Sequence, residues 1–140
     1  MSLKFPGNNK NITQIKGVVF VKIVVFSFTG NCKKFLARCE VNEEHIIELK
    51  EDLEMLENYI LVTPTIGFGE VPPSVRNFLE NNENKPQWVL ASGNRNWGTN
   101  FANAADVINK DYNVPILMKF ELNGTTAEVE KFKQLYEEME

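Results

Sequence analysis

The residues best suited to chemistry form a short polar loop, residues 26–31, directly after an apolar run at 18–25. The loop reads FSFTGN and leads into a segment of helical period. The N–H groups at a helix N-terminus carry partial positive charge and can hold a phosphate without Lys or Arg. Ser27 and Thr29 add hydroxyl donors, and Gly30 permits the positive φ that a concave nest of N–H groups needs. The loop predicts a phosphate site or, alternatively, a capped turn without a ligand.

Two further loops carry residues suited to a flat heterocycle. The first, residues 63–73, has Gly67 and Gly69 one residue apart, so its peptide groups can approach a ligand closely. The second, residues 91–101, combines small residues and amides with Trp97, which could pack on a heterocycle or be a partly buried surface aromatic. Because the phosphate loop lacks the lysine of a P-loop and the spaced glycines of a dinucleotide fingerprint, a mononucleotide is the predicted ligand.

Apolar runs that alternate with segments of helical period predict an α/β fold, a parallel sheet covered by helices on both faces. Five strands are expected, each continuously apolar, at 18–26, 45–49, 59–63, 87–91 and 114–120. Helices are expected at 31–39, at 73–81, within 100–112, and within 125–140 with Thr125 or Thr126 as N-cap. In such sheets ligands lie beyond the carboxyl ends of the strands, so the three loops should meet at one edge.

Composition and charge exclude several other classes of protein. A chain of 140 residues with 43% hydrophobic content suits one domain. The net charge is −4 and no basic stripe is visible, which excludes nucleic acid as a partner. Lys22 interrupts the first apolar run, so we expect a cytoplasmic protein that does not enter a membrane. Cys32 and Cys39 should be free thiols, and with His45 as the single histidine no metal site is expected.

Three motifs, SFTGN, ASGNRNWG and KFELNGT, together resemble the NrdI family of flavodoxin-like proteins. The first is similar to the phosphate loop of flavodoxins, and the other two are hallmarks of the narrower family. The resemblance implies a single flavodoxin-like FMN-binding domain at 21–140, with 1–20 as an N-terminal extension outside the family core. The implied fold is a three-layer sandwich, a five-stranded parallel sheet of order 2-1-3-4-5 with helices on both faces.

The resemblance also implies tightly bound FMN and assigns its contacts. The FMN phosphate is expected against Ser27, Phe28, Thr29, Gly30, Asn31 and Cys32. The isoalloxazine is expected between two loops, Pro64, Thr65, Ile66, Gly67, Phe68 and Gly69 on one side and Ser92, Gly93, Asn94, Asn96, Trp97 and Gly98 on the other. Trp97 should be the stacking ring. Cys32 stands where flavodoxins usually carry a hydroxyl residue, and Ile66 where relatives often carry an aromatic.

The activity implied by the resemblance is that of an assistant to class Ib ribonucleotide reductase. Members of the family pass electrons to molecular oxygen beside the radical-bearing β subunit, and the reduced oxygen helps assemble its dimanganese–tyrosyl radical cofactor. We therefore expect an accessory flavoprotein, fed by an upstream electron donor, that reduces oxygen through FMN rather than turning over a dedicated organic substrate. The alternative is a general flavodoxin-type electron carrier.

The expected rim of the flavin site favours the dedicated partner. An electron carrier with many partners benefits from a strongly acidic face, whereas one defined complex needs a shape-specific, weakly charged surface. The rim is expected to have Glu70 as its only acid and to comprise Ile66, Phe68, Val71, Asn94, Arg95, Asn96 and Trp97.

Overall fold

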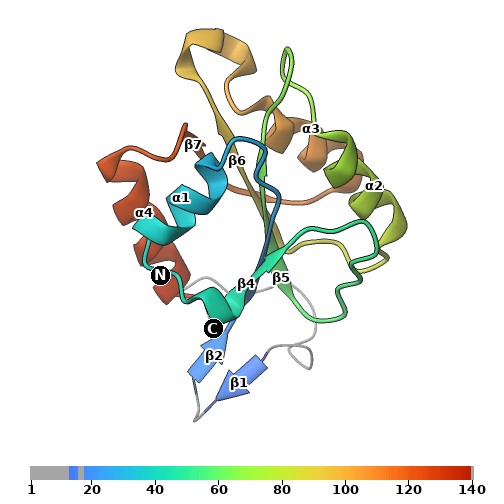
Figure 1. The fold of residues 1–140 in the computed structure, drawn as a ribbon, viewed down its shortest axis with the longest axis vertical. Coiled ribbons are helices and arrows are strands. Elements are labelled where there is room, and N and C mark those ends of the chain that lie inside the picture. Colours follow the sequence, from blue (N-terminus) through green and yellow to red (C-terminus); the bar gives the residue numbers. More distant parts are fainter. Residues whose placement is uncertain (1–12, 16–17, 140) are drawn as a thin grey trace.

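A five-stranded parallel sheet forms the centre of the fold in the part of the chain that the computed structural model describes, residues 13–15 and 18–139 (Figure 1). Its strands are β3 (Lys22–Val25), β4 (Ile46–Glu48), β5 (Tyr59–Pro64), β6 (Trp88–Gly93) and β7 (Ile116–Glu121). They lie in the order β4-β3-β5-β6-β7, all pairs parallel. Counted within this sheet, the order is 2-1-3-4-5, which confirms the predicted topology and places its reversal between β3 and β5.

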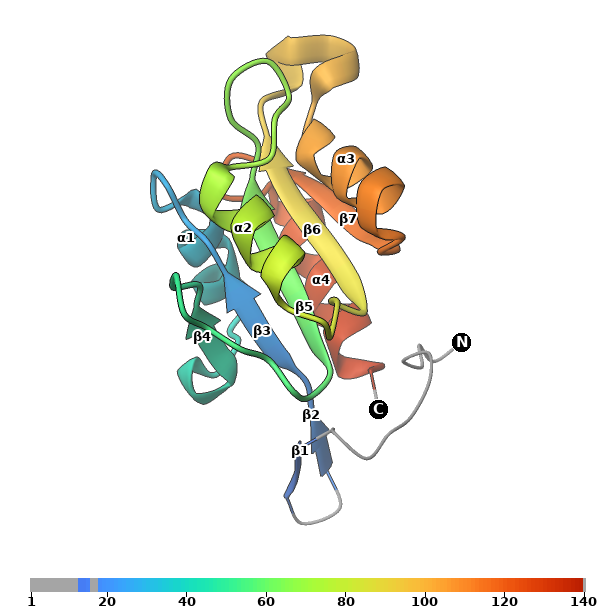
Figure 2. The same ribbon diagram turned by 90° about the vertical axis from the view of Figure 1, so that its right-hand side faces the viewer.

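Helices cover both faces of this sheet (Figure 2). On one face lie α1 (Asn31–Arg38) and α4 (Thr126–Glu137), and on the other lie α2 (Pro73–Asn81) and α3 (Asn103–Tyr112). Phe35 of α1 stacks on Phe120 of β7 with ring centroids 3.9 Å apart, and it also packs against Phe132 of α4. On the opposite face Tyr59 meets Phe78 edge-on. The sheet therefore has two separate cores, as a three-layer sandwich requires.

The predicted first strand, residues 18–26, is wrong as a single element. Its first part forms β2 (Val18–Phe20), which pairs antiparallel with β1 (Thr13–Ile15) in a separate two-stranded sheet. The central sheet starts only at Lys22, opposite Tyr59. The hydrogen-bonding partners of this run change at Val21, beside Lys22, and a single lysine within an apolar run does not by itself indicate the end of a strand. Of the expected extension 1–20, residues 1–12 and 16–17 lie outside the described residues, and its place outside the family core stays a prediction.

The other predicted elements exist, with shifted ends. β6 runs two residues beyond its predicted end, to Gly93, and β4 and β7 are edge strands that are only partly buried rather than buried throughout. Between Asn42 and β4 lies a 3₁₀ turn, η2 (Glu43–His45). A second one, η3 (Arg95–Asn100), occupies the third loop, so α3 starts later than expected, at Asn103. Thr125 is the N-cap of α4.

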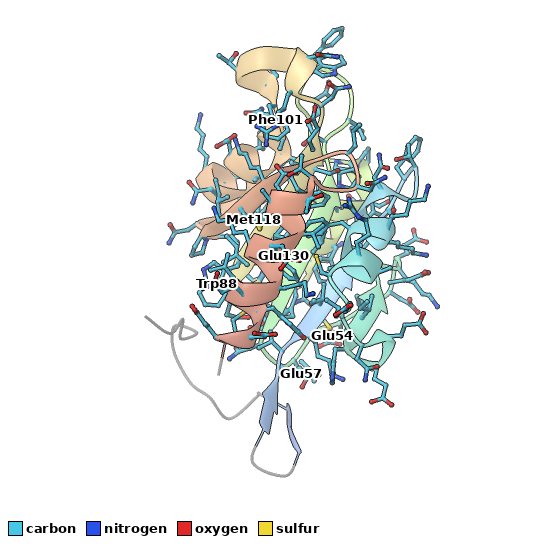
Figure 3. All side chains as sticks on the ribbon, turned by 90° about the vertical axis from the view of Figure 1, so that its left-hand side faces the viewer. Glu54, Glu57, Trp88, Phe101, Met118 and Glu130 are labelled. Atoms are coloured by element: carbon cyan, nitrogen blue, oxygen red, sulfur yellow. The ribbon has the colours of Figure 1, made fainter. Side chains whose placement is uncertain are left out.

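The carboxyl ends of the strands and the loops that follow them lie at one end of the molecule. Figure 3 shows Phe101, from the third loop, at this end, and Glu54 and Glu57 at the opposite end. Cys32 and Cys39 are buried and not bonded to each other. Among the described helices none has the length and apolar character needed to cross a membrane.

Candidate functional site

A cavity of about 250 Å³ lies beyond the carboxyl ends of β3, β5 and β6, beside the reversal in strand order. The three loops selected from the sequence all contribute to its wall. Its lining consists of Phe28, Thr29, Asn31, Pro64, Thr65, Ile66, Gly67, Gly69, Ser92, Gly93, Asn94, Trp97, Asn100, Ala102 and Leu122. The structure thus brings most of the expected contact residues to one place. The expected contacts that do not line the cavity are Ser27, Gly30, Cys32, Phe68, Asn96 and Gly98.

The first loop leads into α1, and no side chain caps the start of this helix. Gly30 is the N-cap residue of α1, with φ 90°, and no side chain accepts a hydrogen bond from the first turn. The Ser27 hydroxyl is buried and has no hydrogen-bond partner among the described residues. A Cβ at Gly30 would meet no atom within 4 Å, so space is open beside the helix start. The loop therefore forms no side-chain cap, and the N–H groups of the helix start and the buried hydroxyl fit an anion.

The second loop makes a tight turn whose two ends bond to each other. Ile66 N–H donates to the Glu70 carbonyl over 3.0 Å, and Glu70 N–H donates back to the Ile66 carbonyl over 2.8 Å. Gly67 and Gly69 both have positive φ, 54° and 107°, a conformation that glycine adopts without strain. Asn103 Nδ2 donates to the Gly69 carbonyl over 2.8 Å and ties the turn to α3. Phe68, at the tip of the turn, is 77% exposed.

The third loop carries Trp97 to the mouth of the cavity. Asn94 Oδ1 accepts a hydrogen bond from Asn96 N–H and so starts the 3₁₀ turn η3. Trp97 is 46% exposed, and its ring meets the Phe68 ring edge-on with centroids 5.6 Å apart. The tips of the second and third loops therefore contact each other through two aromatic side chains.

Between these loops, the backbone at Gly93 lies very close to the backbone at Ala102. A Cβ at Gly93 would lie 2.9 Å from Ala102 Cα and closer still to Ala102 N. Ala102 is the N-cap residue of α3 in the left-handed conformation, and Thr65 Oγ1 accepts from Ala104 N–H in the first turn of the same helix. Glycine at position 93 is thus required for α3 to begin against the end of β6.

Cys32 is placed behind the cavity rather than in its wall. Its Sγ lies 3.6 Å from Ser92 Oγ, and its side chain is 1% exposed. Burial raises the pKa of the Cys32 thiol from its ordinary 9.0 to about 12, opposed by the hydrogen bond with Ser92. The thiol is therefore neutral at physiological pH, and only the backbone N–H of this residue is available to a ligand at the helix start.

Three lining residues were not among the predicted contacts: Asn100, Ala102 and Leu122. Asn100 and Ala102 lie just beyond the expected end of the third site segment. Leu122 follows β7, and its N–H donates to the Gly93 carbonyl over 2.9 Å. Because β7 is parallel to β6, its carboxyl end had to lie at the same sheet edge, and this topology was the signal that could have identified Leu122.

The predicted rim needs two corrections. Val71 is only 7% exposed and belongs to the core beneath α2 and α3, because the tight turn before it directs the chain back to the sheet. Glu70 is not the only acid close to the rim. Arg95 forms ion pairs with Glu121 and Glu128, which follow it by more than twenty residues in the sequence and so could not be assigned to this surface.

Comparison with known proteins agrees with this geometry. Among solved structures, a short-chain flavodoxin associated with a non-canonical PDU bacterial microcompartment aligns with a TM-score of 0.60 and 14% identity, over 85% of this chain and 95% of its own. Oxidised flavodoxin 2 from Bacillus cereus aligns with a TM-score of 0.61 and 18% identity, over 84% of this chain and 97% of its own. At such identities the likeness establishes the flavodoxin-like fold.

The family is established by the sequence itself. A model of the family described as NrdI Flavodoxin like matches residues 23–134, which include all three loops of the cavity. FMN is the cofactor of this family. Together with the sheet order and the helix start at Gly30, the match identifies the chain as a member of the NrdI flavodoxin-like family.

Proposed function

We propose that this protein binds FMN with its phosphate at the start of α1 and its isoalloxazine between the second and third loops. The observation that carries the proposal is the uncapped helix start at Gly30, with the buried, unpaired Ser27 hydroxyl beside it. A phosphate would give both the N–H groups and the hydroxyl the acceptor that they lack. When bound, FMN supplies the capacity to accept and donate one or two electrons.

Side chains and backbone groups of this protein together have three roles in the proposed site. Ser27 Oγ and the N–H groups of the first loop donate hydrogen bonds to the phosphate. The Trp97 ring covers one face of the isoalloxazine and excludes water from it. The positive φ of Gly67 and Gly69 lets their peptide groups approach the edge of the ring, where a side chain would keep them away.

Substitution of Gly30 tests the phosphate assignment. Gly30→Asp places a carboxylate in the open space beside the helix start, where it repels the phosphate, and Gly30→Asn is the matched uncharged control. Both side chains tolerate positive φ comparatively well. We expect Gly30→Asp to lose FMN while Gly30→Asn retains most of it, and we expect riboflavin, which has no phosphate, to bind both variants equally. If Gly30→Asp purifies with stoichiometric FMN, the assignment is wrong.

We further propose that the protein supplies electrons and reduced oxygen for assembly of the dimanganese–tyrosyl radical cofactor in the β subunit of class Ib ribonucleotide reductase. Membership of the NrdI family supports this role. The rim supports it too, because the large exposed apolar side chains around the cavity are Phe28, Phe68, Trp97 and Leu122. An apolar rim of this kind suits one shape-specific complex better than many electrostatically steered encounters. Two unbonded thiols agree with a cytoplasmic location.

A radical-assembly assay separates this role from that of a general electron carrier. Fully reduced protein, the manganese-loaded β subunit and molecular oxygen should together produce a tyrosyl radical signal in electron paramagnetic resonance. Omitting either the protein or oxygen should abolish it. Efficient electron delivery to unrelated acceptors without any radical signal would instead favour the general flavodoxin.

A further inference from the structure

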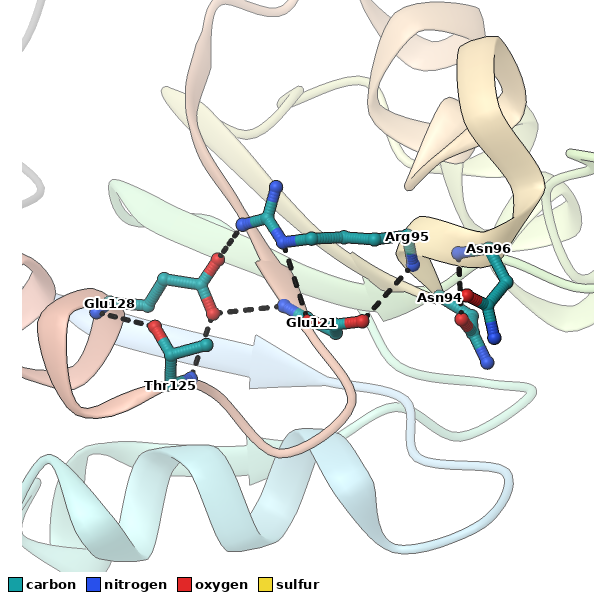
Figure 4. Close-up of polar contacts among 6 residues, drawn as sticks. All are labelled: Asn94, Arg95, Asn96, Glu121, Thr125 and Glu128. Atoms are coloured by element: carbon teal, nitrogen blue, oxygen red, sulfur yellow. Dashed lines mark hydrogen bonds and ion pairs between the residues drawn. The ribbon is translucent and has the colours of Figure 1, made fainter.

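Arg95 links the loop that carries Trp97 to the start of α4, although it does not line the cavity (Figure 4). Its Nη2 lies 2.5 Å from Glu128 Oε2, and its Nε lies 3.4 Å from Glu121 Oε1. Its backbone N–H donates to Glu121 Oε2 over 3.3 Å. Its guanidinium also lies over the Phe101 ring, 4.5 Å from the centroid. One side chain thus joins the third loop to both β7 and α4.

Apart from Arg95, the 3₁₀ turn η3 is weakly attached. Every residue of η3 is exposed, and the backbone hydrogen bonds of Trp97 and Phe101 return to Asn94 and Gly98 within the loop itself. Among the hydrogen bonds, ion pairs and ring contacts of the described residues, the other one that joins an η3 side chain to a different segment is the ring contact of Trp97 with Phe68. Without Arg95, little would determine where Trp97 lies.

Glu128 is held firmly enough to act as the anchor. Its Oε1 accepts hydrogen bonds from Thr125 N–H (2.8 Å) and Glu121 N–H (3.0 Å), and Thr125 Oγ1 accepts from Glu128 N–H (3.1 Å), which completes a capping box. Glu128 is 8% exposed. Burial alone would raise the pKa of its carboxyl, but hydrogen bonds from Thr125, Glu121 and Arg95 lower it below the ordinary value. One oxygen of this carboxylate therefore caps α4 and the other holds Arg95.

We infer that Glu128 and Arg95 are positioning residues that set the place of Trp97 at the mouth of the cavity, through the ion pair between the start of α4 and the third loop. Neither residue needs to touch the flavin for this. The inference deepens the proposed function, because the position of Trp97 matters to flavin binding only if the flavin lies between the second and third loops.

Glu128→Gln separates the two tasks of the carboxylate. Glutamine suits the capping box, since its amide oxygen can accept from Thr125 and Glu121 N–H, but its NH₂ group then faces Arg95 and the ion pair is lost. Arg95→Met removes the guanidinium, with its ion pairs and its contact with the Phe101 ring, while keeping an unbranched side chain. If the pair acts as a unit, the double variant should resemble either single variant rather than the sum of both.

The readout is the fluorescence of Trp97 in protein without FMN. A Trp88→Phe background leaves Trp97 as the single tryptophan. We expect Glu128→Gln and Arg95→Met to increase acrylamide quenching of Trp97 by at most about twofold, because its side chain is already 46% exposed. In the same proteins we expect FMN affinity to fall by about three- to tenfold.

Two control variants change α4 without changing the link to Arg95. Thr125→Ala removes the cap hydroxyl but leaves Glu128 Oε2 on Arg95, so it should lower the melting temperature and leave Trp97 quenching unchanged. Lys133→Met breaks the exposed ion pair with Glu40 on the same helix and should change neither quantity.

Unchanged Trp97 quenching in both Glu128→Gln and Arg95→Met would overturn the inference, as would an equal increase in Thr125→Ala. Arg95 lies on an exposed loop, so its substitution should not prevent folding. Because quenching is measured without flavin, a negative result there rejects only the positioning role of Arg95 and Glu128. Failure of the proposed function would instead appear as absence of FMN binding in the unsubstituted protein.

Discussion

Gly93→Ala should destabilise the protein by about 2 to 3 kcal/mol, near the upper end of the usual cost of overpacking. The new Cβ would lie 2.9 Å from Ala102 Cα, whereas ordinary contacts begin near 3.4 Å, so the start of α3 must move by at least about 0.5 Å. Ala102 Cα and Ala102 N, which lies closer still, both belong to the backbone, so no change of rotamer can relieve the contact. The movement also strains the hydrogen bond from Ala104 N–H to Thr65 Oγ1.

Urea denaturation of the protein without FMN measures this cost. The midpoint should fall while the slope stays unchanged, because the substitution alters stability rather than the surface exposed on unfolding. Gly30→Ala is the matched control: its Cβ meets no atom within 4 Å, and only the positive φ of 90° opposes it, at about 1 kcal/mol. A loss of stability in Gly93→Ala no greater than in Gly30→Ala would refute the close packing of α3 on β6.

Three further predictions concern Trp97 of the third loop, the two cysteine thiols and the Glu128 carboxylate. Trp97→Ala should weaken FMN binding by about 1 to 3 kcal/mol in a fluorescence titration, and unchanged affinity together with unchanged flavin emission would remove Trp97 from the site. As the pH rises from 9 toward 12 the free energy of unfolding should fall, because the unfolded thiols release protons near 9.0 while burial keeps the pKa of Cys32 and Cys39 at about 12 in the folded protein. Burial also raises the pKa of Tyr59 and Tyr136 above their ordinary 10.0, so the Cys32→Ala/Cys39→Ala variant should lose the fall between pH 9 and 10 and keep part of the fall above it; an unchanged profile would contradict the reasoning. In acid, the free energy of unfolding should fall as the pH drops below 4.5, because the pKa of Glu128 in the folded protein lies below its ordinary value. Glu128→Gln should show a shallower fall. Identical acid profiles would contradict the role of Arg95 and of the Thr125 and Glu121 N–H groups.

The parallel sheet was predictable because apolar runs alternate with segments of helical period, and its strand order followed from the resemblance to the flavodoxin-like family. The place of the first loop at the cavity was also predictable, because loops at the carboxyl ends of parallel strands lie at one edge of the sheet. The split of the first run at Val21 was not predictable, since Val18–Phe20 and Lys22–Val25 differ in pairing partner, and Lys22 alone does not indicate where one strand ends and the next begins.

Residues whose contacts come from distant segments were also beyond the sequence. Arg95 was assigned to the rim, but its guanidinium pairs with Glu121 and Glu128, and this pairing depends on where β7 ends and α4 begins. Such pairing is set by tertiary packing, which local residue types do not encode. Leu122 differs, because the predicted parallel topology could have placed the end of β7, and with it Leu122, at the cavity.

The contact between Phe68 and Trp97 has a consequence for the rate at which a flavin enters. The two rings meet edge-on with centroids 5.6 Å apart, so an isoalloxazine in the proposed position between their loops must displace this contact. Separation forfeits an aromatic contact worth about 0.5 to 1.5 kcal/mol, which lowers the population of the open arrangement. A contact of this strength opens far faster than FMN arrives, so the observed rate should stay linear in FMN concentration, with a slope lowered by roughly two- to tenfold. Removing the Phe68 ring should raise that slope.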